Sequence, residues 1–172
     1  MYNNGAKLVL KSVVLRDNQA YNGGAVLLTS GSAILTVIDS LFVNNSASYG
    51  GAIQLLNKDA TLSCTSTDFV TNTAVQGGAV RLQGYEGQPG PLTEFYDCRF
   101  QANMATNKGS AMMLKYGSAN LTRCRVTDNG EDDERSVKGD IDYNGNYEYF
   151  DDNSNIMAGN NNANGATCAT DA

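Results

Sequence analysis

The sequence of 172 residues contains no histidine, no tryptophan and only two prolines. Without histidine, the chain cannot build the usual Ser-His-Asp or Cys-His catalytic sites or a zinc site with histidine ligands. Without tryptophan, it has no indole ring on which a sugar could stack, although nine tyrosines remain. These absences exclude several common enzyme classes before any motif is considered.

Positive charge and long apolar runs are also scarce. Twelve Lys and Arg residues against eighteen Asp and Glu give a formal net charge of −6, which argues against nucleic acid as a partner. The longest apolar runs, such as LVLKSVVL at residues 8–15, are much shorter than the ~20 residues that span a bilayer, so we expect no membrane insertion. The opening MYNNGAK shows no signal peptide, and we interpret the chain as a piece of a longer protein because its first repeat begins part-way through a unit.

A glycine phrase returns at a nearly constant interval. GGA begins at Gly23, Gly50 and Gly77, with 27 residues between successive copies, and the variants GSA and GDI follow at Gly109 and Gly139. The second glycines of the three full copies are Gly24, Gly51 and Gly78. An internal period of this length indicates a repeat architecture.

A second phrase, F-x-x-N, runs in phase with the first. Its full copies are Phe42/Asn45, Phe69/Asn72 and Phe100/Asn103, and Leu15 and Val126 replace Phe in the outer copies. The complete unit therefore reads F-x-x-N-x-A-x-x-G-G-A-[VI].

Within each unit, apolar and polar residues alternate over runs of four to six residues, which is the period of a strand. A 27-residue unit of about three short strands cannot bury its apolar side alone, but it can do so against a copy of itself. We therefore predict an all-β fold, a right-handed parallel β-helix (β-solenoid) with about 27 residues per coil and five to six coils. Equivalent strands should lie about 4.8 Å apart along the axis.

This stacking assigns a structural role to both phrases. The Phe residues should form a ladder inside the solenoid, and the Asn residues should form a hydrogen-bonded ladder at a turn. The glycines should stand at a corner that requires positive φ or close backbone approach. We expect coils over residues 1–143, loop insertions at 84–92 and 130–139, and an Asn- and Gly-rich last coil, cap or tail at 144–172.

Two of the four cysteines share one column of the repeat. Cys98 and Cys124 both stand in the phrase C-R-[FV]-x-x-N, so they should be neighbours, either in a disulfide or as two buried thiols. Cys64 falls in an apolar column and is interpreted as a core residue, and Cys168 has no evident partner. Their spacing is not that of a metal site, so we expect no metal and no cofactor.

The charged residues point to a solvated face more than to catalysis. Asp39 and Asp97 share an outward column, and Arg123 follows Asp97 in it, which predicts a surface ion pair. Together with Arg99 and Arg125, Arg123 could hold an acidic sugar, but charges that solvate a flat face are the favoured interpretation. We therefore expect that the chain is not an enzyme.

Two sequons, Asn44-Asn45-Ser46 and Asn120-Leu121-Thr122, are candidate N-glycosylation sites for a secreted eukaryotic chain. Asn44 and Asn120 each flank an inward position, so their side chains should point outward.

The pairing of F-x-x-N with G-G-A-[ILV] resembles the passenger domains of chlamydial polymorphic membrane proteins, over roughly residues 7–143. That resemblance implies a surface-exposed β-helical adhesin. Leu15, Ser110 and Val126 depart from the family pattern.

We predict an extracellular or cell-surface repeat protein that serves as a rigid scaffold for adhesion or assembly. Its expected partners are surface proteins or glycans, with neighbouring copies joined end to end as an alternative. The alternatives are a polysaccharide-binding or polysaccharide-cleaving β-helix (lyase-like or hydrolase-like), and a subunit of an extracellular filament.

Overall fold

The computed structural model describes residues 2–3, 7–29, 31–85, 88, 90–130, 141–144, 147–150 and 156–159. Nearly all of them are in strands or short turns, and none is helical. Accordingly, this part of the chain holds no helix with the length and apolar character needed to cross a membrane.

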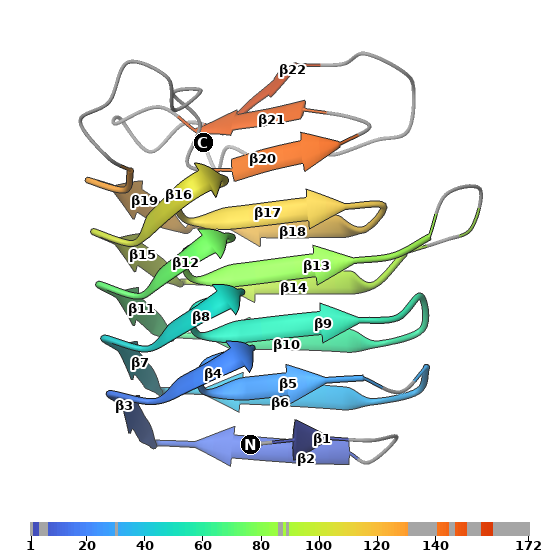
Figure 1. The fold of residues 1–172 in the computed structure, drawn as a ribbon, viewed down its shortest axis with the longest axis vertical. Helices are drawn as coiled ribbons and strands as arrows, with labels where there is room; N and C mark the ends of the chain where they lie inside the picture. Colours follow the sequence, from blue (N-terminus) through green and yellow to red (C-terminus); the bar gives the residue numbers. More distant parts are fainter. Residues whose placement is uncertain are drawn as a thin grey trace.

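Four parallel sheets, which we name A to D, enclose one interior (Figure 1). Sheet A consists of β1 (Tyr2–Asn3), β5 (Val26–Leu28), β9 (Ile53–Leu56), β13 (Val80–Gln83), β17 (Met112–Lys115) and β20 (Ile141–Asn144). Sheet B consists of β2 (Lys7–Lys11), β6 (Ile34–Ile38), β10 (Thr61–Thr65), β14 (Leu92–Tyr96) and β18 (Ser118–Thr122). Sheet C consists of β3 (Val14–Arg16), β7 (Leu41–Val43), β11 (Asp68–Val70), β15 (Arg99–Gln101) and β19 (Arg125–Thr127). Sheet D consists of β4 (Gln19–Asn22), β8 (Ser46–Tyr49), β12 (Thr73–Gln76) and β16 (Met104–Lys108).

Each coil passes through sheets B, C, D and A in turn and then repeats one level higher. Figure 1 shows the chain running to the right along the near strands of sheet A and back to the left along sheet B behind them, while it climbs from β1 towards β20. This path is a right-handed coil. Four coils are complete, and β18 and β19 begin a fifth, so the described coils are fewer than the five to six we expected. The prediction of a parallel β-solenoid with about 27 residues per coil is confirmed.

The sheets pair strictly in register because the coils have nearly the same sequence pattern. In sheet C, for example, Phe69 pairs with Phe42 on one side and with Phe100 on the other. Alternate residues of the strands of sheets B and C point inward, so apolar side chains of successive coils meet in columns. The core contains all the Phe residues of these columns together with Leu, Val, Ile and Ala.

The glycine phrase marks the corner between sheets D and A. Gly50 has φ of +63°, a left-handed conformation that favours glycine. Gly51 lies directly against the next coil, where a Cβ atom would stand 2.0 Å from the carbonyl oxygen of Gly78. The Gly51 N–H also donates to the Gly77 carbonyl at 3.0 Å. The phrase therefore recurs because each coil needs both a left-handed turn and a position without a side chain.

Beyond the solenoid sheets, β21 (Tyr147–Phe150) and β22 (Ile156–Gly159) form an antiparallel pair. Residues 84–91 connect β13 to β14 within the predicted insertion 84–92. The predicted insertion at 130–139 falls outside the described residues except for Gly130, and so does most of 144–172. The assignments of 130–139 as a loop and of 144–172 as a last coil, cap or tail therefore stay predictions.

Candidate functional site

The corner between sheets B and C, which we name the BC corner, gathers charged and hydroxyl side chains. A two-residue turn joins the two sheets in each coil. The first residue of the turn has φ near +50° and faces outward, and the column reads Ser12, Asp39, Ser66, Asp97 and Arg123. The second residue faces inward, and its column reads Val13, Ser40, Thr67, Cys98 and Cys124. The first position of the turn therefore gives a column of solvated side chains, and the second position gives a column of inward side chains.

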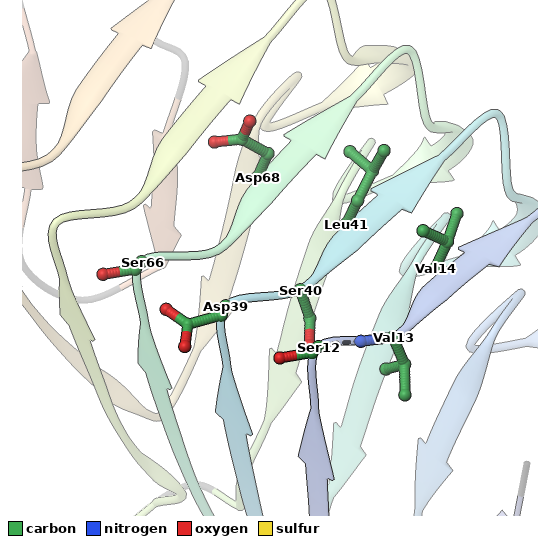
Figure 2. Close-up of a pocket in the computed structure, with 8 residues that line it drawn as sticks. All are labelled: Ser12, Val13, Val14, Asp39, Ser40, Leu41, Ser66 and Asp68. Atoms are coloured by element: carbon green, nitrogen blue, oxygen red, sulfur yellow. Dashed lines mark hydrogen bonds between the residues drawn. The ribbon is translucent and has the colours of Figure 1, made fainter.

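An open hollow of about 410 Å³ lies at the BC corner of the first three coils. Figure 2 shows its lining, which consists of Ser12, Val13, Val14, Asp39, Ser40, Leu41, Ser66 and Asp68. The buried Ser40 hydroxyl fixes the floor, because it accepts from the Val13 N–H at 3.3 Å and donates to the Ile38 carbonyl at 2.7 Å. The hollow offers hydroxyl and carboxylate oxygens beside three apolar side chains.

Two ion pairs continue the BC corner into the later coils. Arg99 donates to Asp68 at 2.6 Å, and Arg123 donates to both carboxylate oxygens of Asp97 at 2.7 and 2.6 Å. The hydrogen bonds from Arg123 hold the pKa of Asp97 below its ordinary value. The Arg123 guanidinium also lies over the Tyr96 ring, 4.2 Å from its centroid. Two of the three arginines considered for an acidic sugar therefore already hold carboxylates of this chain.

The chemistry of this corner is that of a hydrogen-bonding surface. Its serine and aspartate oxygens can accept hydrogen bonds from ligand hydroxyls, and Tyr96 adds an aromatic face. Among the residues that the structure describes, no three His, Cys, Asp or Glu side chains gather closely enough to hold a metal ion.

Three free cysteines, Cys64, Cys98 and Cys124, lie buried behind the BC corner. The Cys98 Sγ lies 3.5 Å from the Cys64 carbonyl oxygen and 3.4 Å from the Tyr96 carbonyl oxygen, and its single S–H can donate to either of them. Burial raises the pKa of Cys64 well above its ordinary value. The pKa of Cys98 is also raised, by its hydrogen bond to Cys124 and by burial. Of the two arrangements left open for Cys98 and Cys124, the structure has the thiols; Cys168 is outside the described residues.

The phenylalanines of the repeat form a stack through sheet C. The ring centroids of Phe42 and Phe69 are 5.0 Å apart, and those of Phe69 and Phe100 are 4.8 Å apart, with interplanar angles of 10° and 5°. All three side chains are fully buried, and Phe95 of sheet B meets the stack edge-on. These rings tie three coils together from the inside.

The asparagines of the repeat form a second ladder at the turn between sheets C and D. Asn45, Asn72 and Asn103 are fully buried, and each donates through its backbone N–H and its Nδ2 to the Oδ1 of the Asn one coil further on. The ladder begins at Asn18 and ends at Asn129. It links five successive turns, because each Asn Oδ1 accepts from both the backbone N–H and the side-chain amide of the Asn one coil earlier.

Both candidate glycosylation sites are exposed. Asn44 follows β7 at φ of +55°, and its Nδ2 donates to Asp17 Oδ1 at 2.6 Å. Asn120 stands on the outer side of β18. Their glycosylation stays a prediction.

One pair of residues was missed at the sequence level. Strand alternation places Gln54 and Arg81 on the outside of sheet A, yet their exposed fractions are 1% and 6%. In the register of sheet A, Gln54 and Arg81 stand in one column between the apolar residues Leu27 and Met113. These apolar neighbours, directly after the glycine corner, are the signal in the sequence that the column is buried.

Residues 39–55 match the Chlamydia polymorphic membrane protein repeat. The match includes Phe42, Asn45, Gly50 and Gly51, which supply a Phe rung, an Asn rung and the glycine corner of one coil. The predicted resemblance to the polymorphic membrane protein repeat is therefore confirmed for this segment. Neither a curated protein nor a solved structure matches the chain.

Proposed function

We propose that this chain is a rigid solenoid segment of an extracellular or cell-surface protein, and that it serves as a scaffold for adhesion or assembly. The observation that carries the proposal is the unbroken Asn ladder, in which buried side-chain amides link every described coil to the next. The polymorphic membrane protein repeat at residues 39–55 supports the location, because the family name describes membrane proteins.

Rigidity follows from how each coil is bonded. Every interior coil has hydrogen-bonded neighbours on both sides in all four sheets, so bending would break several ladders together. Such a rod holds its outward columns at fixed spacing, and binding residues concentrate on surfaces that a rigid scaffold positions. We therefore assign recognition to the outward columns, and surface proteins or glycans are the partners we propose.

A binding role is favoured over catalysis by the state of the charged groups. Asp68 and Asp97 are both engaged by arginines, and the hydrogen bonds from Arg123 lower the pKa of Asp97, which makes that carboxyl group a poor proton donor. We accordingly propose that the chain is not an enzyme.

Antibody labelling of intact cells of the source organism tests the proposed location. An affinity-purified antibody against the folded chain should label cells before permeabilisation, and external protease should remove the label. Labelling that appears only after permeabilisation would overturn the proposal. An antibody against a cytosolic protein of the same cells provides the control for membrane integrity.

Saccharide binding at the BC corner is a second candidate function. The hollow of about 410 Å³ and the Tyr96 ring, which is 40% exposed, favour it. Binding of neutral oligosaccharides to an array should weaken in Asp39→Ala and Tyr96→Ala but not in Asp59→Ala, whose carboxylate lies outside the lining of the hollow. Equal binding by all three variants would exclude this corner as the saccharide site.

A further inference from the structure

The outward side chains on either side of the glycine corner form a second cluster, which we name the DA seam and define as Tyr21, Tyr49, Gln54, Arg81 and Gln83. Tyr21 and Tyr49 stand near the ends of β4 and β8, and the other three stand on the neighbouring strands β9 and β13 of sheet A. The corner brings the two sheets close together. A Cβ atom on Gly50 would lie 3.1 Å from the Gln54 Cβ, and one on Gly77 would lie 2.9 Å from the Arg81 Cβ.

Arg81 is a buried cation without a carboxylate partner among the described residues. Its guanidinium carbon lies 4.5 Å from the centroid of the Tyr49 ring, and its Nη2 donates to the amide oxygen of Gln83. Its Nε has no hydrogen-bond acceptor. Burial lowers the pKa of Arg81, although an arginine remains charged at any physiological pH. Burying a charge without a counter-ion costs free energy, so the binding of an anion beside Arg81 would be favourable.

One coil away, Gln54 has a buried acceptor without a donor, whereas Arg81 has a buried donor without an acceptor. It is the register partner of Arg81 in sheet A, it is 1% exposed, and its Oε1 accepts no hydrogen bond. A ligand that satisfies both residues must accept from Arg81 and donate to Gln54. A carboxylate with a neighbouring hydroxyl group meets that requirement, whereas a simple anion such as chloride meets only half of it.

Aromatic rings extend the DA seam along the rod. Tyr49 packs on Arg81, and Tyr21 packs edge-on against Tyr49 with ring centroids 5.6 Å apart. Tyr21 is 68% exposed, so one face of its ring is open to a ligand. Arg81 and Tyr21 are two coils apart, which corresponds to about 10 Å along the solenoid axis. A short oligosaccharide spans this distance, and a single sugar does not.

We propose that the DA seam binds an acidic oligosaccharide of the uronic-acid class. The sugar carboxylate pairs with the Arg81 guanidinium, an adjacent hydroxyl donates to Gln54 Oε1, and a further sugar ring lies against Tyr21. The half-buried Tyr49 ring covers Arg81, so a change of its side-chain rotamer opens the site. The ligand lies parallel to the rod axis, on a face two sheets away from the BC corner.

Isothermal titration of the folded chain with oligogalacturonate and oligoglucuronate tests this inference. At least one of the two oligomers should bind, and its carboxyl methyl ester should not. Arg81→Met should weaken binding about tenfold or more, since it removes a charge-assisted pair while keeping a long apolar stem. Arg99→Met is the matched control, because Arg99 is already paired with Asp68 at the BC corner, and its affinity should equal that of the parent chain.

Tyr21→Ala provides a second variant, which leaves the buried side chains of Gln54 and Arg81 unchanged. Tyr21 is exposed, so the fold should be kept, and binding of the oligomer should weaken several-fold while binding of the monosaccharide acid stays weak in both proteins. The inference is overturned if neither oligomer binds, if the methyl ester binds equally, or if folded Arg81→Met binds like the parent chain. Preference for a sulfated oligosaccharide or an acidic peptide over both uronates would equally overturn it. None of these outcomes bears on cell-surface location, which the antibody experiment decides separately.

Discussion

Asn72 accepts two hydrogen bonds from Asn45 at a single oxygen, one from the backbone N–H at 3.0 Å and one from Nδ2 at 2.9 Å. Its own Nδ2 donates to the Phe42 carbonyl at 3.0 Å and to Asn103 Oδ1 at 2.9 Å. A side-chain amide has two N–H donors and one oxygen with two lone pairs, so Asn72 uses its full capacity. No other residue type offers the same donors and acceptors at this length, which explains why Asn recurs in every coil.

Replacement of Asn72 by Ala should therefore destabilise the solenoid by about 2 kcal/mol or more, because buried donors and acceptors on both neighbouring coils lose their partners. Urea unfolding followed by circular dichroism measures the free energy of unfolding. Asn18→Ala is the matched control, since Asn18 is at the start of the ladder and, among the residues that the structure describes, donates only to Asn45. Equal losses in the two variants would contradict the account of the ladder.

Phe69 occupies the middle of the ring stack and should be the most sensitive core position. Phe69→Ala removes contacts with Phe42, Phe95 and Phe100, and the loss of a fully buried Phe costs about 3–5 kcal/mol. Phe69→Leu should cost less, because the natural ladder already ends in Leu15 and Val126. The same unfolding experiment compares both variants. A Phe69→Ala protein as stable as its parent would show that the stack adds nothing.

The repeat made most of the fold predictable from the sequence. In three nearly identical units, Phe42, Asn45 and Gly50 and their counterparts stand at equivalent positions. Parallel stacking is the arrangement that lets each unit bury its apolar side against a copy. The burial of Gln54 and Arg81 was not predictable in this way. Alternation assigns side chains to one face of a strand, but it does not show that the Tyr49 ring of the neighbouring sheet D covers Arg81 at the corner.

The glycine corner supplies a test of backbone contact between coils. Gly51→Ala would place a methyl group 2.0 Å from the Gly78 carbonyl oxygen and 2.6 Å from the Thr73 carbonyl oxygen, both of which belong to backbone that cannot move alone. We expect this variant to lose more stability than a typical surface change, or to fail to fold. Gly31→Ala is the control, since its methyl group would approach only flexible side chains, those of Asp59 at 3.4 Å and Asn57 at 4.0 Å. Thermal unfolding of the two variants side by side measures the difference, and a Gly51→Ala protein that melts with the parent would contradict the close approach.

The buried thiols should be unreactive while the chain is folded. Because burial raises the pKa of Cys64, little of its thiolate forms near pH 8.5, the ordinary thiol pKa. A hydrogen bond from Cys98 lowers the pKa of Cys124, so this thiol should be protected from reagents by its burial instead. A Cys168→Ser variant removes the cysteine outside the described residues. It should release no colour with an aromatic disulfide reagent when native, and should react at three thiols in denaturant. Reaction at only one thiol in denaturant would show that Cys98 and Cys124 form a disulfide, and rapid native reaction would contradict their burial.

The ion pair between Asp97 and Arg123 predicts a specific titration. Hydrogen bonds from Arg123 lower the pKa of Asp97 in the folded chain, so the pair stabilises the fold above the unfolded pKa, and this stabilisation is lost as the pH falls through the lowered folded value. In Arg123→Met the pKa of Asp97 should rise towards its ordinary value, as followed by carbon-detected NMR of the carboxyl group. Arg99→Met should leave the Asp97 pKa where it is, because Arg99 donates to Asp68 instead. If the Asp97 pKa is the same in the parent chain and in Arg123→Met, the bidentate pair between Arg123 and Asp97 does not exist in solution.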